Sequence, residues 1–303
     1  MYRNIKSAVV GSINADLILQ TERMPQSGES ITGTSYGHAN GGKGANQAIG
    51  LARLGTNTKM IGKVADDENG RRLIDNLKKN NVDVSCVATD GSQTGLAAII
   101  LDGEGKNRII VYEGANAEIT PSFAADSITD DLDLLLVQFE TREETVISAV
   151  NKAIEKGITT VIDCGPAKQF ALEKMQGATI ISPNETETEA LTGIYPESND
   201  DILKASEILA DRSKAKFVVL KLGERGCSVW DGNSLRIIPA YKGEVVDTTA
   251  AGDCFTAAMA LEFIRSGDIH LACDVGNKAG CIAVGRMGAD ASMPTAEDIL
   301  NFK

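Results

Sequence analysis

Alternation between short apolar segments and amphipathic segments, from residue 132 to the end of the chain, constrains the fold most strongly. Residues 132–137 are almost all apolar, which is typical of a parallel strand that is covered on both faces. The same character recurs at 159–163, 179–181 and 217–220. Helical apolar spacing occurs at 143–156, 202–212, 255–265 and 271–284. The pattern predicts an α/β fold with a doubly wound, mostly parallel sheet flanked by helices.

The first part of the chain adds a β-hairpin to this pattern. Strands are expected at 7–11 and 58–64, and helices at 42–54 and 67–80. Residues 94–113 differ, because two apolar runs flank the glycine-containing turn sequence 102–105, which is typical of a hairpin. Together with strands expected near 13–19 and 29–36, the hairpin predicts a small β-sheet lid outside the main body.

These elements predict a single α/β domain over residues 1–303, with lid strands inserted at about 12–40 and 94–113. In a doubly wound sheet, ligands bind beyond the carboxyl ends of the strands, so the loops at those ends are the expected site. No G-x-G-x-x-G follows the first expected strand, which argues against a dinucleotide-binding dehydrogenase.

Composition argues against several classes of protein. The formal net charge is −12, which is unfavourable for a protein whose partner is nucleic acid or an anionic membrane surface. The sequence has no run of about twenty apolar residues and no secretion signal, so a cytoplasmic protein is expected. The six cysteines form no C-x-x-C pair and there are two histidines, which argues against zinc, disulfides and a histidine-based triad.

Residues 245–255 carry the strongest functional signal. They predict a strand end, a tight turn of small residues and a helix that begins near Phe255. Small residues let the backbone approach a ligand closely, and the N–H groups and dipole at a helix start attract an anion. Asp253 adds a carboxylate there, which suits a general base that deprotonates a hydroxyl beside a bound phosphate. Taken alone, Asp253 would be better explained as the N-cap of an ordinary helix.

A glycine-rich segment with one lysine lies upstream. Residues 37–44 nearly match the phosphate-binding P-loop, but Gly44 stands where Ser or Thr should bind magnesium. No buried hydrophobic strand precedes the segment at 32–36, so we reject the P-loop interpretation. The alternative is a loop that brings backbone amides and Lys43 against a small polar ligand, with Asn46 one turn into the following helix.

Both segments together resemble the ribokinase (PfkB) family of sugar kinases. Asn14 and Asp16, after the first strand, are side chains of the kind that bind sugar hydroxyls through paired hydrogen bonds. The resemblance spans nearly the whole chain and rests on residues 11–16, 41–47, 184–187, 221–226 and 247–253. It implies a ribokinase-like fold and an ATP-dependent phosphotransferase that acts on an alcohol group, most directly D-ribose to D-ribose 5-phosphate. A kinase for deoxyribose, another sugar or a nucleoside, and a non-catalytic sugar-binding regulator, stay open as alternatives.

The resemblance also implies roles for individual residues. Asp253 would take the proton from the primary hydroxyl of the sugar. The N–H groups of Ala250, Ala251, Gly252 and Asp253 would stabilise the moving phosphoryl group. The expected sugar ligands are Asn14, Asp16, Gly42, Lys43, Asn46, Glu140 and Asp253. The expected nucleotide ligands are Asn184, Glu187, Lys221, Gly223, Gly226, Gly252 and Asn277.

The resemblance implies two metal ions and a partner chain as well. Magnesium would lie near Glu187 and be held through water, because Mg²⁺ keeps several of its waters. An activating monovalent cation, usually K⁺, would be held mostly by backbone carbonyls at Asp247, Thr249, Ala283, Arg286, Gly288 and Ser292. Because exposed lid strands commonly need a partner, a homodimer formed through the lid is expected.

Several of these residues have simpler explanations when they are taken alone. Glu140 has the position of a helix-starting carboxylate, and the acidic residues at 184–187 complement a helix dipole. Lys221 can be a plain strand exit, and Asn277 a polar residue on a helix.

Two positions depart from the family pattern. Asp163 opens the run Asp-Cys-Gly-Pro where the family often has Asn-Pro-Ala-Pro, and this extra carboxylate is expected to weaken nucleotide binding or alter metal binding. Cys254 follows the expected base. It is either an oxidation-sensitive thiol at a helix start or, as we favour, a buried inert one.

Overall fold

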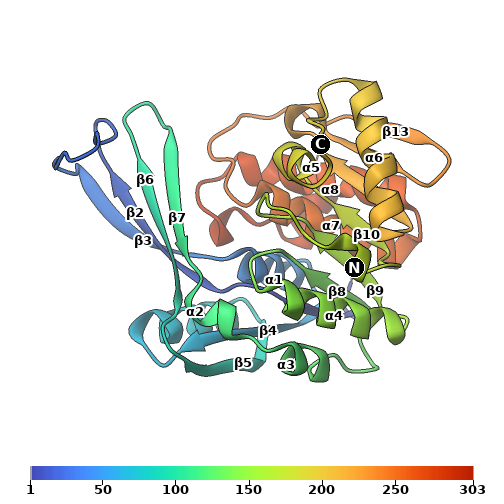
Figure 1. The fold of residues 1–303 in the computed structure, drawn as a ribbon, viewed down its shortest axis with the longest axis horizontal. Helices are drawn as coiled ribbons and strands as arrows, with labels where there is room; N and C mark the ends of the chain where they lie inside the picture. Colours follow the sequence, from blue (N-terminus) through green and yellow to red (C-terminus); the bar gives the residue numbers. More distant parts are fainter. Residues whose placement is uncertain (1, 303) are drawn as a thin grey trace.

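The computed structural model describes residues 2–302, which form two β-sheets and the helices around them (Figure 1). Within that range the larger sheet has nine strands, in the order β13-β12-β11-β10-β9-β8-β1-β4-β5. Neighbours from β11 to β5 run parallel, and β12 and β13 are antiparallel additions at one edge. The strands are β1 (Lys6–Val10), β4 (Asn57–Ala65), β5 (Asp83–Gly91), β8 (Leu134–Val137), β9 (Thr159–Asp163), β10 (Ile180–Ser182), β11 (Phe217–Lys221), β12 (Cys227–Trp230) and β13 (Leu235–Ile238).

Each face of this sheet has its own hydrophobic core. Leu134 and Leu136 of β8 lie in one buried cluster, whereas Leu135 and Val137 lie in the other. Successive side chains of a strand point to opposite faces, so an all-apolar strand needs helices on both sides. One face carries α1 (Lys43–Arg53), α2 (Glu68–Lys79), α7 (Ala251–Ser266), α8 (Ile269–Val284) and α9 (Ala296–Leu300). The other face carries α3 (Pro121–Asp126), α4 (Glu143–Glu155), α5 (Glu185–Thr192) and α6 (Asn199–Ser213). The predicted doubly wound α/β fold is confirmed.

The smaller sheet, which we call the lid, projects from the main body (Figure 1). Its order among the described residues is β3-β2-β6-β7. β2 pairs parallel with β6, while β3 and β7 are antiparallel to their neighbours. The strands are β2 (Asn14–Gln20), β3 (Ser35–Gly41), β6 (Gly95–Leu101) and β7 (Asn107–Tyr112). The expected hairpin is confirmed as β6 and β7.

The strand expected near 29–36 is wrong in position. β3 begins at Ser35 and pairs with β2 as far as Gly41, opposite Asn14. Pairing with β2 therefore extends the strand into the glycine-rich segment. The small and polar residues of that segment did not predict a strand. Because β3 leads directly into α1, the lid is continuous with the glycine-lysine loop. Six of the seven residues of β3 are exposed or only partly buried, unlike the buried strand that precedes a P-loop.

Short or polar elements escaped prediction. β5 has no apolar run, because its residues at the sheet edge are only partly buried. The other missed elements are β12, β13, α3, α9 and the short helical turns Gly114–Glu118, Leu172–Lys174, Gly223–Arg225 and Asp290–Ser292. Between residues 2 and 302, none of the helices combines the length and the apolar character that a membrane crossing requires.

Candidate active site

Polar contacts join the carboxyl ends of parallel strands to the N-terminal ends of two helices. Asp163 ends β9 and Lys221 ends β11, and their side chains form an ion pair with an Oδ2–Nζ distance of 2.9 Å. Gln47 of α1 donates to Asp163 and also to Asp253 of α7. These contacts lie at the edge of the sheet where a doubly wound fold binds ligands.

The helix that carries Asp253 begins earlier than the sequence suggests. α7 starts at Ala251 rather than near Phe255, and Ala250 precedes it in a left-handed conformation with φ of 60°. The small side chain of Ala250 limits the strain of that conformation. Asp253 consequently lies within the first turn of the helix instead of before it.

The start of α7 presents free backbone donors. Ala251 N donates to Thr248 O at 3.3 Å, but the N–H groups of Gly252 and Asp253 precede the first intrahelical bond, which Cys254 N donates to Ala250 O. Together with the helix dipole, they form a site that stabilises an anion.

The Asp253 carboxylate is held from several sides. Asn46 Nδ2 donates to Oδ2 at 3.0 Å, and Gln47 Nε2 donates to Oδ1 at 3.0 Å. Lys43 Nζ lies 4.0 Å from Oδ1. Burial raises the pKa of Asp253, against the lowering effect of the Lys43 charge. A buried, oriented carboxylate with a raised pKa has the properties of a general base.

The glycine-lysine loop packs tightly against the loop after β1. Gly42 has φ of 91°, and a β-carbon there would lie 2.7 Å from Ser12 O and 2.8 Å from Asn14 N. Gly44 is equally crowded, because its β-carbon would lie 2.6 Å from Ser12 N. Only glycine fits these positions, and the close approach directs Lys43 toward Asp253.

Glu140 connects the end of β8 to the same loop. Its Oε2 accepts hydrogen bonds from Ser12 Oγ and from Lys43 N, the latter at 3.0 Å. The structure thus joins Glu140 to the loop, so it is more than a carboxylate that starts a helix.

Asn14 and Asp16 lie at the base of the lid. Asn14 is buried, and its Oδ1 accepts from Asn116 Nδ2 at 2.7 Å, so its own N–H groups are the part that can donate to a ligand. Asp16 is half-buried against Gly41. Burial and the nearby charge of Glu140 raise the pKa of Asp16 to about 7.

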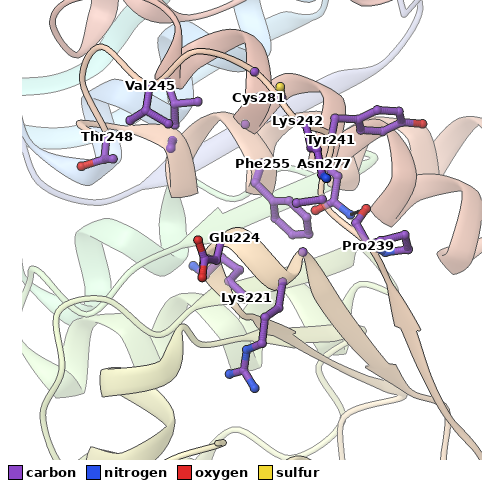
Figure 2. Close-up of a pocket in the computed structure, with 18 of the residues that line it drawn as sticks. Lys221, Glu224, Pro239, Tyr241, Lys242, Val245, Thr248, Phe255, Asn277 and Cys281 are labelled. Carbon is purple, nitrogen blue, oxygen red and sulfur yellow. Dashed lines mark hydrogen bonds between the residues drawn. The ribbon is translucent and has the colours of Figure 1, made fainter.

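A large cavity of about 950 Å³ opens beside the start of α7 (Figure 2). Its walls come from the end of β11, the segment 239–248 and helices α7 and α8. Five of the residues predicted to be nucleotide ligands line it: Lys221, Gly223, Gly226, Gly252 and Asn277. Both contacts of the Asn277 amide nitrogen go to backbone carbonyls, Ile238 O and Pro239 O, each at 3.1 Å, which leaves its side-chain oxygen for a ligand.

Asn184 and Glu187 lie next to this cavity without lining it. They form a capping box: Asn184 Oδ1 accepts from Glu187 N at 2.9 Å, and Glu187 Oε2 accepts from Asn184 N at 2.7 Å. Glu187 is buried, and its Oε2 lies 3.8 Å from Lys221 Nζ. The capping role therefore occupies Oε2 of Glu187 and leaves Oε1 available to a ligand.

The segments expected to hold a monovalent cation come together. Asp247 Oδ2 accepts from Gly288 N at 2.9 Å, and its Oδ1 accepts from Thr249 N at 2.9 Å. Val284, where α8 ends, accepts from Asp247 N. Ala283 and Ser292 are buried nearby, whereas the Arg286 guanidinium pairs with Asp298. Arg286 thus offers only its backbone to this site.

Asp163, the carboxylate that departs from the family pattern, has a cationic partner in the structure. It is fully buried, and the Lys221 ammonium neutralises it. Burial alone would raise its pKa, but the charges of Lys221 and Lys43 hold the pKa of Asp163 below its usual value. Cys254 is also buried, and burial raises the pKa of its thiol, which favours the inert thiol over the oxidation-sensitive one.

Residues that sequence reasoning did not assign complete the site. Gln138 Nε2 donates to Gln47 Oε1 at 2.6 Å, and Thr256 Oγ1 donates to Asp163 at 3.0 Å. Asn116 supports Asn14. Gln47 lies within the glycine-lysine motif, and that position could have identified it as a site residue from the sequence. The other side chains act through partners distant in sequence, which a single sequence does not reveal.

The chain is similar to known proteins along nearly its whole length. A model described as pfkB family carbohydrate kinase matches residues 4–296. A ribokinase of Bacillus subtilis (strain 168) is 37% identical over 300 residues, which cover 98% of each chain. A deoxyribokinase of Salmonella typhi is 31% identical over 301 residues, which cover 97% of each chain. The solved structure of Arabidopsis thaliana ribokinase complexed with ribose and ATP has a TM-score of 0.89, with 29% identity and 98% of each chain covered.

Proposed function

The chain belongs to the pfkB family of carbohydrate kinases, and we propose that it is an ATP-dependent kinase of D-ribose that forms D-ribose 5-phosphate and ADP. The position of Asp253 carries the proposal: it is a buried carboxylate between the glycine-lysine loop and a cavity with free N–H donors. Similarity to ribokinases, one of them solved with ribose and ATP, supports the choice of substrates.

In the proposed reaction, Asp253 accepts the proton of the ribose 5-hydroxyl. The hydroxyl oxygen then attacks the γ-phosphorus of ATP, and ADP leaves. The N–H groups of Gly252 and Asp253 stabilise the charge on the moving phosphoryl group. Ala250 and Ala251 form the turn that aims those donors at the phosphate.

The proposed sugar contacts come from the lid base and the glycine-lysine loop. Asn14 offers amide donors, and Asp16 accepts from two neighbouring ribose hydroxyls. The remaining proposed contacts are Gly42, Lys43, Asn46 and Glu140. Their support is the set of hydrogen bonds that joins the loop to Glu140 and Asp253.

The proposed nucleotide contacts line or adjoin the cavity, whose size suits ATP. They are Asn184, Glu187, Lys221, Gly223, Gly226, Gly252 and Asn277. Mg²⁺, which would neutralise phosphate charge, suits the free Oε1 of Glu187 if waters intervene.

We also propose a K⁺ site formed by Asp247, Thr249, Ala283, Arg286, Gly288 and Ser292. Support comes from the carbonyl groups at the C-terminal end of α8, where the helix dipole favours a cation. Asp247 links this region to the turn before α7 through Thr249. An ion there would steady the donors at the start of α7.

Three proposals concern the whole chain. We treat residues 1–303 as a single ribokinase-like domain that carries the lid strands. A homodimer formed through the lid is supported by β7, an edge strand whose six residues are all exposed, Ile110 among them. A cytoplasmic location is supported by the free thiols of all six cysteines.

Deoxyribose is the second candidate substrate, because a deoxyribokinase is also similar to the chain. Asp16 distinguishes the two sugars: a carboxylate that accepts from two neighbouring hydroxyls loses one partner in 2-deoxyribose. A kcat/KM for 2-deoxyribose equal to or above that for ribose would replace ribose as the assigned substrate.

The test is a coupled assay of ADP release with ATP, Mg²⁺ and a panel of sugars, with and without K⁺. We expect ribose-dependent ADP release that K⁺ increases. Release with another sugar only would keep Asp253 as base and overturn the assigned sugar. Binding of ribose without ADP release would favour the non-catalytic regulator.

A further inference from the structure

Asp163 is a buried carboxylate to which the proposed reaction gives no role. Asp163 accepts four hydrogen bonds: from Lys221 Nζ at 2.9 Å, Thr256 Oγ1 at 3.0 Å, Gln47 Nε2 at 3.1 Å and Gly165 N at 3.1 Å. It is fully buried. So many donors from separate elements fix its position and its charge, because burying a carboxylate is unfavourable unless it is paired.

Lys221 extends from Asp163 to the anion-binding end of α7. Its ammonium group pairs with the buried Asp163, and Lys221 lines the cavity together with Gly252. A β-carbon added to Gly252 would lie 3.9 Å from Lys221 Nζ. The ammonium group is therefore within reach of a phosphoryl group that is bound by the N–H donors of α7.

The position of the Lys221 ammonium group depends on its acidic neighbours, Asp163 and Glu187. Asp163 is the closer of the two, at 2.9 Å against 3.8 Å. Glu187 is already committed to the cap of α5, so Asp163 is the main partner that orients the ammonium group.

The link to Gln47 fixes Asp163 relative to the base. The Gln47 amide is fully buried, and Gln138 holds its oxygen. Its nitrogen donates to Asp163 on one side and to Asp253 on the other. Asp253 and the Asp163–Lys221 pair are thus held in one rigid arrangement.

We propose that Asp163 is a positioning residue for phosphoryl transfer, which holds the Lys221 ammonium group at the anion-binding end of α7, and that Lys221 is a catalytic residue there. This inference rests on the proposed kinase function. In the transition state, negative charge spreads over the transferred phosphoryl oxygens, and a fixed ammonium group beside them lowers the barrier. The extra carboxylate at 163 then strengthens catalysis by ordering a cation, instead of weakening nucleotide binding.

The test is a double-mutant cycle of Asp163→Asn, Lys221→Met and the double variant, with kcat and the KM values of ribose and ATP measured for each. We expect Lys221→Met to lower kcat about 10²-fold, as for the loss of one transition-state donor. We expect Asp163→Asn to lower kcat about tenfold, with the KM of ribose changed less than about twofold. The double variant should match Lys221→Met within about threefold, because the two residues act as one unit.

The exposed pair Asp211 and Lys214 on and beside α6 provides the matched control. The same substitutions there, Asp211→Asn and Lys214→Met, should leave kcat unchanged, and an equal loss in them would overturn the inference. An unchanged kcat in Asp163→Asn, or a double variant that loses the product of both single effects, would also overturn it. A purely structural pair would lower the thermal midpoint without changing kcat.

The test also covers an unstable Asp163→Asn variant and an inactive wild-type protein. If Asp163→Asn shows no cooperative thermal unfolding, the double variant replaces it, since both charges of the pair are removed. A double variant more than about tenfold slower than Lys221→Met would then contradict the inference. A wild-type protein with no sugar-dependent ADP release would instead overturn the proposed function, independently of these variants.

Discussion

The main-body half of the active site and the lid half differ in how firmly the chain holds them. In the main body, Asp253, Gln47 and Asp163 are buried and joined by side-chain hydrogen bonds. In the lid, burial falls along β2 from Asn14 to exposed Leu19, and all of β7 is exposed. The predicted sugar ligands of the lid, Asn14 and Asp16, lie at its base.

This difference separates two tasks. Groups that stabilise a transition state work best when they are already in place, because no reorganisation is needed during the reaction. A sheet that covers the sugar must instead let it enter, and closure can then exclude water. We therefore expect changes in the main body to lower kcat and changes in the lid to alter sugar binding.

The largest effect is expected for Asp253→Asn. The amide cannot accept the proton of the hydroxyl, so kcat should fall by about 10²- to 10⁴-fold. Calorimetry should still detect ribose binding, because Asn14, Asp16 and Lys43 are intact. A variant with nearly normal turnover would show that Asp253 is not the base.

A smaller effect, confined to sugar binding, is expected for Asp16→Asn at the lid base. Loss of a charged acceptor for two hydroxyls should raise the KM of ribose about 10- to 100-fold, with a much smaller change in kcat. Glu104→Gln provides a matched control, because Glu104 is an exposed lid carboxylate paired with Lys106. If both variants change KM equally, Asp16 has no specific contact with the sugar.

The pKa of Asp16 adds a dependence on pH. Because that pKa is raised to about 7 by burial and by Glu140, against the effect of Arg72, the carboxylate is lost as pH falls through 7. The KM of ribose should therefore rise about tenfold between pH 8 and pH 6. In Asp16→Asn this rise should disappear, and its persistence would assign the dependence to another group.

The smallest effect on the chemistry is expected on the outer lid. Ile110→Lys places a charge on an exposed strand residue, which should disfavour pairing of two lids. Light scattering should show a shift from dimer toward monomer, with kcat changed only a few-fold. Ile237→Lys on β13, an exposed residue of the main sheet, should leave the mass unchanged. A wild-type monomer would contradict the proposed dimer.

The sequence predicted the repeating parts of the fold because their signal is local. The apolar run at β8 and the small-residue turn before α7 are readable within a few residues. β3 was misplaced because pairing with β2, and not its own composition, makes residues 35–41 a strand. Gln138 and Thr256 were missed because their roles depend on Gln47 and Asp163, which are far away in sequence.

Asp163 illustrates the same limit at the active site. In the sequence it is an extra carboxylate. Whether it weakens nucleotide binding or strengthens catalysis depends on whether a cation lies beside it. β9 and β11 flank β10 in the sheet, so their carboxyl ends lie at the same edge and Lys221 reaches Asp163 there. Such a pairing is a property of the sheet order, which no local pattern contains.

Nuclear magnetic resonance of the reaction mixture tests the central claim most directly. The protein would be incubated with ATP, Mg²⁺, K⁺ and ribose labelled with ¹³C, and the product followed by its ³¹P and ¹³C signals. The account predicts ADP and a phosphate monoester whose phosphorus couples to carbon 5 of ribose. Unchanged ATP, or a phosphate ester on the oxygen of any other ribose carbon, would contradict it.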